Sequence, residues 1–310
     1  MDDSYKIRNY QIENYTDLIK LIVQSERLTN EDYVSPRDLR ENTIKRKDFH
    51  PEECLFLVEK AGNIIGYSNA IPELDIGRII LSCLVHPAHR RKGLGTMLVN
   101  SAMNYAISKR AKVVHTNILI DNEVGKKFLN KLGFKFVRSF PILRLNLSEI
   151  RLKNKTQNCQ IRCLKRGEEE KLTKLQNRSF ANTWGYHPNT IEEISNRINF
   201  SDYLTNDIIV GYDGNELIGY CWMQVYHNEI GLDLKEKPQA RIYMLGVDPQ
   251  HRRKGIGKIL LFEGLRRLKN KDIQIVELNV DSKNEAACRL YRSQGFKVWK
   301  TSLWFEKVLD

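Results

Sequence analysis

Short apolar runs and helical repeats alternate along this chain, in an order that predicts a mixed α and β protein. Residues 79–85 and 241–247 are strand-like apolar runs, and each is followed by a turn that contains a proline. A basic loop with two glycines comes next. It leads into apolar residues at helical spacing, to about Ser108 in the first case and over 258–268 in the second. This order of strand, turn, loop and helix occurs twice.

The two occurrences belong to an internal duplication. The loops 90–95 and 252–257 lie 162 positions apart. The same offset relates four further pairs of identical residues: Pro87 and Pro249, Asn122 and Asn284, Gly133 and Gly295, and Phe134 and Phe296. Agreement over this length without a gap predicts two related domains. We assign them to residues 1–150 and 159–310, joined by the polar linker 151–158.

The remaining elements follow one order in both halves. The first half has predicted strands at 5–8, 53–58, 64–70, 112–119, 136–138 and 142–147, and predicted helices at 14–27, after Ser35-Pro36 and at 122–132. The second half has predicted strands at 161–162, 208–212, 216–223 and 273–280, and predicted helices at 168–180, 190–199 and from Asn284 onward. Thr190 and Glu193 predict a capping box. Gly66 and Gly219 are only 153 positions apart, so we place nine extra residues (162 − 153) within 227–239.

Composition narrows the function classes. The chain is 41% hydrophobic and 28% charged, which is typical of a soluble globular protein. It has no apolar run long enough to span a membrane and no signal-peptide core, so we expect a cytoplasmic protein. The six cysteines are scattered, which argues against a disulfide framework and a metal site. The net charge of +12 favours an anionic partner, but no basic run is interleaved with aromatic residues, which argues against specific nucleic-acid binding.

The two glycine loops have the chemistry of a phosphate site. The first amides of a helix have no partner within the helix, and the helix dipole favours negative charge there. Gly255 and Gly257 leave room for a pyrophosphate to approach these amides. Arg252, Arg253 and Lys254 add charged donors. The same argument applies to the loop at 90–95.

A second motif lies in the predicted helix that begins near Asn284. Asn284 stands at its start, as a cap or a ligand-binding amide, and Tyr291 lies two turns further on. A tyrosine hydroxyl has an ordinary pKa of about 10, which suits it to protonate a departing thiolate. The alternative role for Tyr291 is that of a half-buried core aromatic.

Together these motifs resemble those of the GNAT (Gcn5-related) N-acetyltransferase family. The family's acyl-CoA loop, Arg/Gln-x-x-Gly-x-Gly/Ala, is matched at 90–95 and at 252–257. Its later motif, Asn-x-x-Ala-x-x-x-Tyr-x-x-x-Gly-Phe, is matched by Asn284, Ala287, Tyr291, Gly295 and Phe296. The resemblance implies an α+β fold of two tandem GNAT domains, each with a mixed, mostly antiparallel sheet that splays at its fourth and fifth strands and is flanked by helices.

The resemblance also implies site residues and acetyl-CoA as acyl donor. In the second half the family's cofactor contacts fall on Leu245, Gly246, Val247, Arg252, Arg253, Lys254, Gly255, Ile256, Gly257, Lys258, Asn284 and Ala287. The amides of 245–247 would pair with pantetheine, one near Val247 would stabilise the oxyanion, and Tyr291 would protonate the coenzyme A sulfur. In the first half the corresponding contacts fall on Cys83, Leu84, Val85, Arg90, Arg91, Lys92, Gly93, Leu94, Gly95 and Thr96.

The first half departs from the family pattern at one position. Leu129 stands 162 positions before Tyr291, and leucine cannot donate a proton. We therefore predict that the first domain binds acyl-CoA but contributes little chemistry, and that the second domain transfers acetyl directly to a primary amine. Since the tandem chain already pairs two domains, a monomer is expected.

The acceptor side is less defined by the sequence. Residues expected near the acceptor are Trp184, Tyr186, Trp222, Tyr226, Glu229 and Tyr243. Many GNAT enzymes use a carboxylate of the fourth strand as general base, but 241–247 has none, which leaves Glu229, Asp233, Glu277 or a water relay.

Four functions remain open at this stage. The preferred one is an acetyltransferase for a small-molecule or peptide amine. The layout also resembles that of the mycothiol synthases, which acetylate a cysteinyl amine on a sugar-linked precursor. A protein α-amine acetyltransferase and a non-catalytic acyl-CoA-binding module are the other two.

Overall fold

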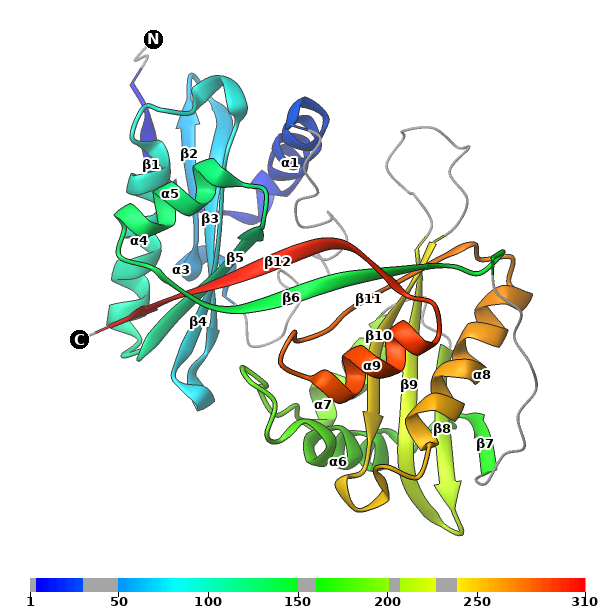
Figure 1. Cartoon of the computed structure of the whole chain (residues 1–310). Helices are drawn as coiled ribbons and strands as arrows, with labels where there is room; N and C mark the ends of the chain where they lie inside the picture. The colour runs from blue at the N-terminus through cyan, green and yellow to red at the C-terminus, as the bar shows by residue number, and fades with distance from the viewer. Residues whose placement is uncertain (1–3, 30–49, 150–159, 201–206, 227–238, 310) are drawn as a thin grey trace. The chain divides into compact units, whose positions relative to one another are not determined.

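The computed structural model describes residues 4–29, 50–149, 160–200, 207–226 and 239–309 (Figure 1). The chain forms two compact units. Unit 1 consists of Met1–Arg138 and Leu303–Asp310, and unit 2 consists of Ser139–Ser302. The predicted helix after Ser35 and the predicted linker lie outside the described residues.

Unit 1 contains a sheet of strand order β1-β2-β3-β4-β5-β12. Its strands are β1 (Lys6–Asn9), β2 (Leu55–Lys60), β3 (Asn63–Glu73), β4 (Arg78–Val85) and β5 (Val113–Leu119), with the beginning of β6 (Lys135–Asn146) and the end of β12 (Lys297–Val308). Its helices are α1 (Tyr15–Thr29), α3 (Pro51–Cys54), α4 (Leu94–Ser108) and α5 (Glu123–Lys131), with short 3-10 turns at Ile12–Asn14, Leu74–Ile76 and Pro87–His89.

Unit 2 repeats this arrangement, with strand order β6-β11-β10-β9-β8-β7. Its strands are β7 (Gln160–Cys163), β8 (Ile208–Asp213), β9 (Glu216–Tyr226), β10 (Gln239–Val247) and β11 (Ile275–Asn279), with the remainder of β6 and β12. Its helices are α6 (Glu169–Phe180), α7 (Ile191–Phe200), α8 (Ile256–Asn270) and α9 (Glu285–Ser293), with a 3-10 turn at Pro249–His251.

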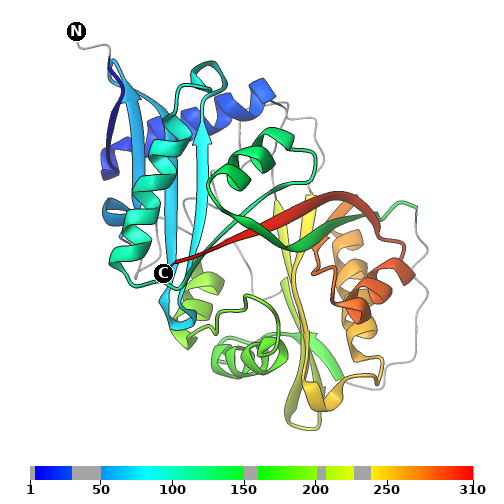
Figure 2. The same cartoon turned by 60° about the vertical axis from the view of Figure 1, so that its left-hand side comes forward.

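Each sheet is covered by helices on both faces (Figure 2). In unit 2, α8 and α9 pack on one face through a core that includes Leu260, Val276 and Tyr291. Helices α6 and α7 pack on the other through Leu175, Ile194 and other apolar residues. The predicted capping box begins α7 as expected: the amide of Glu193 donates to Thr190 Oγ1 at 3.1 Å, and the amide of Thr190 donates to Glu193 Oε2 at 2.8 Å.

Both sheets splay between their fourth and fifth strands. In unit 2 the parallel pairing of β10 with β11 covers only residues 239–241 and 275–277, although β10 continues to Val247. In unit 1 the parallel pairing of β4 with β5 covers 78–81 and 113–116, although β4 continues to Val85. All the other strand pairs with a described register are antiparallel. The α+β fold of two tandem GNAT domains, predicted from the sequence, is confirmed.

The closing strands differ from the expectation in two ways. The compact units are not the halves 1–150 and 159–310, because β6 passes from unit 1 into unit 2 at Ser139 and β12 passes from unit 2 into unit 1 at Leu303. The duplication explains the exchange, since the closing strand of one half has the pattern that fits the other. The strands predicted at 136–138 and 142–147 are one strand, β6. Pro141 lies within it and still accepts a hydrogen bond from the amide of Val280 at 3.1 Å.

The second half's extra residues are also placed differently. Met223 of β9 is equivalent to Ala70 of β3, at the offset of 153 already given. Met223 pairs with Ile242 and Ala70 pairs with Leu81, so the offset between β4 and β10 at this point is 161 (242 − 81). It returns to 162 at Met244, because the register shifts between Ile242 and Met244. One of the nine extra residues is therefore a β-bulge at Tyr243, and eight precede β10. Bulges are enriched beside active sites, where they redirect a side chain.

Candidate active site

The two glycine loops have the same backbone conformation. Gly93 and Gly255 are the N-caps of α4 and α8, with φ of 80° and 81°. Arg91 and Arg253 each have a φ of 63°, which is unusual for a residue with a large side chain. A Cβ atom added at Gly93 or Gly255 would meet nothing within 4 Å. Both loops therefore present open space at a helix N-terminus, which fits a pyrophosphate.

The basic residues of the loops have different roles. The guanidinium of Arg252 donates to the carbonyl oxygens of Val247 at 3.3 Å and Ser179 at 2.7 Å, so this side chain fixes the loop against the sheet and α6. Arg90 likewise donates to the carbonyl of Val85 at 3.1 Å. Arg253 and Lys254 are exposed and, among the described residues, have no hydrogen bond or ion pair. These two side chains of the loop are therefore available to an anion.

Three predicted parts of the unit 2 site converge at Gly257. A Cβ atom on Gly257 would lie 3.5 Å from Val247 Cγ2 on β10 and 3.8 Å from Leu290 Cδ2 on α9. The glycine loop, the end of β10 and the helix of Tyr291 thus meet at one point. Unit 1 shows the same closeness, because a Cβ atom on Gly95 would lie 3.3 Å from Phe128 Cζ on α5.

The amides predicted to hold pantetheine lie where the sheet is open. Leu245, Gly246 and Val247 pair with β9 on one side of β10, and they lie beyond the last rung shared with β11 on the other. Cys83, Leu84 and Val85 occupy the same position on β4. A chain with amide and carbonyl groups could add there as a strand does.

Asn284 serves as the N-cap of α9. Its Oδ1 accepts a hydrogen bond from the amide of Ala287 at 3.1 Å, as Asn122 Oδ1 accepts from Gly125 at 2.7 Å in unit 1. Only the Nδ2 group of Asn284 is left to donate to a ligand. This cap fixes where α9 begins, and therefore where Tyr291 lies.

Tyr291, the next residue of α9 after Leu290, is buried and packs edge-to-face on Phe296, with ring centroids 5.8 Å apart. Burial raises the pKa of its hydroxyl, and the nearby thiols of Cys221 and Cys288 raise it further, so the phenol stays protonated at neutral pH. Among the described residues the hydroxyl has no hydrogen-bond partner. In unit 1 the same place is filled by Leu129, which is also buried. The two units thus differ at one shared position, which holds a tyrosine in unit 2 and a leucine in unit 1.

Of the predicted acceptor residues, Trp222 and Tyr243 pack on the α6 and α7 face. Trp222 is fully buried and packs edge-to-face on Tyr243 at 5.4 Å. Tyr186 Oη donates to Asn177 Oδ1 at 2.7 Å, and Trp184 packs on Phe140 at 6.0 Å. Tyr226 lies at the end of β9, while Glu229 and Asp233 lie outside the described residues. Tyr243 is therefore the predicted acceptor residue nearest the splay.

One residue of this face was not found from the sequence. Arg197 of α7 donates to Tyr243 Oη at 2.5 Å, and its guanidinium lies 5.5 Å from the Tyr243 ring centre. A single sequence gives no sign of this contact, because it depends on how α7 crosses the sheet. Glu277, a predicted general-base candidate, is held by Arg144, whose Nε lies 2.8 Å from Glu277 Oε1.

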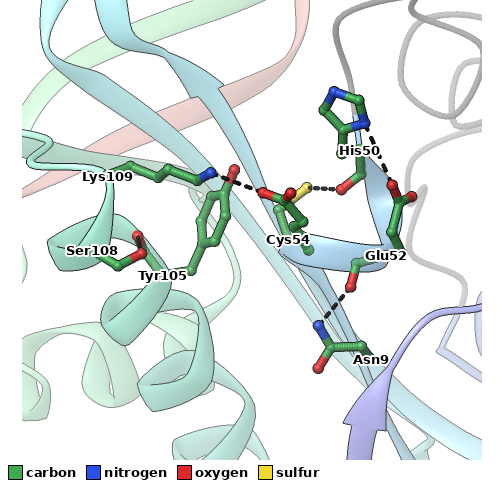
Figure 3. Close-up of polar contacts among 8 residues, drawn as sticks. Asn9, His50, Glu52, Cys54, Tyr105, Ser108 and Lys109 are labelled. Atoms are coloured by element: carbon green, nitrogen blue, oxygen red, sulfur yellow. Dashed lines mark hydrogen bonds and ion pairs between the residues drawn. The ribbon is translucent and has the colours of Figure 1, made fainter.

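The cysteines have structural surroundings in both units. The five described cysteines are free thiols, with Cys54 and Cys221 buried and Cys83, Cys163 and Cys288 partly exposed. Cys54, the last residue of α3, lies near Tyr105 and Lys109 at the C-terminal end of α4 (Figure 3). Its thiol donates to the carbonyl of His50 at 3.3 Å, beside an ion pair of Lys109 with Glu53 at 2.8 Å. Burial raises the pKa of Cys54 to about 12, so this network anchors α4 and holds no reactive thiolate.

Comparison with known proteins agrees with this geometry. The profile of the acetyltransferase (GNAT) family matches residues 19–134 and 170–296. This chain belongs to the GNAT family. It is an acyltransferase, and the family's acyl donor is acetyl-CoA. The glycine loops and splayed strands of both units fit that donor. Among the described residues, no helix is both long and apolar enough to cross a membrane, and no three His, Cys, Asp or Glu side chains are grouped to hold a metal.

Relatives cover most of the chain. A mycothiol acetyltransferase of Acidothermus cellulolyticus is 28% identical over 236 residues, which are 72% of this chain and 70% of the relative. A GCN5-related N-acetyltransferase from Sphaerobacter thermophilus has a TM-score of 0.73 at 18% identity, covering 99% of this chain and 96% of that chain. A tandem GNAT protein from the clavulanic acid biosynthesis pathway has a TM-score of 0.71 at 14% identity, covering 98% of each. At these identities the two solved structures show the fold alone.

Proposed function

We propose that this protein transfers acetyl from acetyl-CoA to a primary amine in unit 2, and that unit 1 binds acetyl-CoA without catalysing transfer. The observation that carries the proposal is Tyr291, which lies on helix α9, the helix that reaches Gly257 of the glycine loop through Leu290, whereas unit 1 has Leu129 at this position. Leucine cannot protonate a leaving thiolate, whereas the hydroxyl of a tyrosine carries a proton that it can donate.

In this proposal the residues of unit 2 divide the work between the two faces of the sheet. The loop amides and the side chains of Arg253 and Lys254 bind the pyrophosphate. The open edge of β10 at 245–247 orients the thioester, and one of its amides stabilises the charge on the carbonyl oxygen. Tyr291 delivers its proton to sulfur from the α8 and α9 face. The amine attacks from the α6 and α7 face, near Tyr243. Much of the rate then comes from holding the two reactants in line.

Direct attack is tested by looking for an acetylated enzyme. The protein is mixed with radiolabelled acetyl-CoA without an amine, quenched in acid and assayed for label on the chain. We expect no stoichiometric label, because all of the described cysteines lie outside the positions assigned to the reaction except Cys83 in unit 1. Label on a residue of unit 2 that is chased into product by an added amine would replace direct attack with a covalent intermediate.

The name of the sequence relatives supports a second, narrower acceptor. A mycothiol acetyltransferase is 28% identical to this chain. An acceptor related to the precursor of that thiol is therefore the specific alternative. It is tested by offering a cysteinyl amine on a sugar beside simple amines, and a higher kcat/KM for the former would favour it.

A further inference from the structure

A row of polar side chains crosses the sheet of unit 2 on the face opposite α8 and α9. Strand register pairs Gln224 with Arg241, Arg241 with Glu277, and Glu277 with Arg144. Their neighbours along each strand pack into the core under α8 and α9, so the pleat turns these four side chains to the other face. We call Gln224, Arg241, Glu277 and Arg144 the polar row. It lies at the last rung before β10 and β11 separate.

One end of the row is held in place. Glu277 Oε1 accepts hydrogen bonds from Arg144 Nε at 2.8 Å and Arg144 Nη2 at 2.5 Å. The Arg144 guanidinium stacks 3.3 Å from the ring centre of Trp299. The charge of Glu277 is therefore already compensated by Arg144, in a geometry that needs no help from Arg241.

Arg241 is the uncompensated member of the row. It is partly buried and, among the residues that the structure describes, makes no hydrogen bond or ion pair. Its neighbours in register are an amide, Gln224, and the carboxylate that Arg144 already holds. A partly desolvated guanidinium without a counter-ion is costly to keep, so such a group is expected where a ligand supplies the negative charge.

Unit 1 has a hydrogen-bonded pair in the corresponding row but an apolar residue in place of Arg241. On the equivalent rung Ile80 pairs in register with His115, and His115 Nε2 lies 2.8 Å from Glu306 Oε2. Glu306 and Arg144 are 162 positions apart, so the pair joins equivalent strands in the two units. Ile80 is equivalent to Arg241. Ile80 precedes Leu81, which pairs with Ala70, and Arg241 precedes Ile242, which pairs with the equivalent residue Met223. Both units thus have a hydrogen-bonded side-chain pair on this rung, between the fifth strand and the strand beside it. Among the described residues, only unit 2, the unit with Tyr291, has an arginine without a partner on the same rung, Arg241.

We propose that Arg241 binds an anionic group of the acceptor, so that the acceptor is a primary amine that also bears a carboxylate or a phosphate. This inference rests on the proposed function, because it assumes that the amine enters unit 2 from the α6 and α7 face. Tyr243, two residues further along β10, lies between the row and the open edge at 245–247. An anion on Arg241 therefore holds the amine on the side of the sheet where β10 opens. Guanidinium forms two parallel hydrogen bonds with a carboxylate or a phosphate.

The test compares matched amines with and without an anion. Three pairs are assayed with acetyl-CoA: L-cysteine with L-cysteinamide, L-phenylalanine with L-phenylalaninamide, and O-phosphoethanolamine with ethanolamine. The first two pairs test a carboxylate and the third a phosphate. An amide also lowers the pKa of its neighbouring amine, so the readout is how the preference within a pair changes between wild type and Arg241→Gln.

Arg241→Gln is expected to lower kcat/KM for the anionic member by about 10- to 100-fold, mainly through KM, as for the loss of a charged hydrogen bond. The neutral member should change less than about twofold. Arg241→Lys keeps the charge without the planar fork and should fall between wild type and Arg241→Gln. Arg166→Gln, an exposed arginine in the loop before α6, is the matched control and should leave both members unchanged.

Two results overturn the inference alone. Equal losses for both members in Arg241→Gln, with an unchanged melting temperature, would make Arg241 structural, and turnover of neutral amines only would remove the anion from the acceptor. The proposed function fails differently: coenzyme A release would not depend on any amine in the wild type, and Tyr291→Phe would behave like the wild type.

Discussion

Units 1 and 2 share the backbone that fits acetyl-CoA and differ in the side chains around the reacting groups. The glycine loops have φ values within about a degree of each other, at 80° and 81° for Gly93 and Gly255. Asn122 and Asn284 cap their helices in the same way. Both sheets open partway along the fourth strand, after Leu81 in unit 1 and after Arg241 in unit 2. A phosphate site built from glycine and backbone amides can therefore persist in a unit whose side chains have changed.

Three differences fall at or near the positions that the proposed function assigns to the reaction. Leu129 stands for Tyr291, and β4 pairs regularly with β3 where β10 has a bulge at Tyr243. Ile80 stands for Arg241 on the neighbouring rung. Proton transfer and acceptor recognition require a particular side chain at a particular place, so a single substitution removes them. We infer that the duplication left one catalytic unit and one binding unit.

The largest expected effect comes from a carboxylate in each glycine loop. Gly257→Glu has room for its Cβ atom, which would lie 3.5 Å from Val247, but it places negative charge where phosphates bind. We expect it to abolish turnover and one of two acetyl-CoA sites counted by calorimetry. Gly95→Glu should remove the other site and leave turnover within about twofold.

The comparison of units breaks if Gly95→Glu also abolishes turnover while the protein stays folded. A wild-type stoichiometry of one would instead mean that unit 1 has lost the cofactor as well as the chemistry.

Removal of the Tyr291 hydroxyl, the proposed proton donor, is expected to have the next largest effect. Tyr291→Phe should lower kcat by about 100-fold or more, which is typical for the loss of a general acid, while acetyl-CoA binding is kept. The matched control is Tyr105→Phe in unit 1, a tyrosine whose pKa is also raised by burial. Steady-state rates of coenzyme A release measure both. A wild-type rate in Tyr291→Phe would exclude the proton-donor role.

Deletion of Tyr243 tests the bulge. It would give β10 the regular register of β4, and we expect kcat/KM to fall by about tenfold because the chain on one side of the bulge is displaced by one rung. Tyr243→Phe keeps the bulge and loses only the hydrogen bond from Arg197, so it should cost less. Equal losses in the two variants would assign the effect to the hydroxyl, and circular dichroism controls for unfolding.

The smallest expected effect is a pH dependence of stability, which should distinguish the His115 and Glu306 pair of unit 1 from the Arg144 and Glu277 pair of unit 2. Burial lowers the pKa of His115 below its ordinary value of 6.5, although Glu306 opposes this. Near this pH, His115 therefore binds a proton more readily in the unfolded chain than in folded unit 1. The free energy of unfolding of unit 1 should then fall as the pH drops below about 6.5. The Arg144 and Glu277 rung of unit 2 has no histidine and should not respond in this range.

Hydrogen exchange of β5 and β11 amides at pH 7.5 and 5.5, followed by mass spectrometry, measures this difference. His115→Gln should remove the pH response of β5 and cost about 1 kcal/mol at pH 7.5 through the lost hydrogen bond. A β5 response that persists in this variant would assign it to another group.

Sequence periodicity and spacing predicted most of the elements and the part of the site that is local in the chain. In each unit, the strand, the glycine loop and the helix that follows it form one continuous stretch of about 30 residues. The glycine caps with positive φ at Gly93 and Gly255 follow from residue type. The motif with Tyr291 is local in the same way, because Asn284 caps the short helix that carries Tyr291.

Other features were decided only by the tertiary structure, because they depend on contacts between strands that are far apart in the sequence. The exchange of β6 and β12 could not be predicted, because the duplicated pattern fits either unit. The bulge at Tyr243 needed the register of β9, and the pairing of Arg144 with Glu277 joins residues 133 positions apart. The sequence by itself therefore determined the two glycine loops with their helices, and the leucine of unit 1 at the position of Tyr291. The acceptor face was decided only by the sheet, since its residues become neighbours through strand pairing.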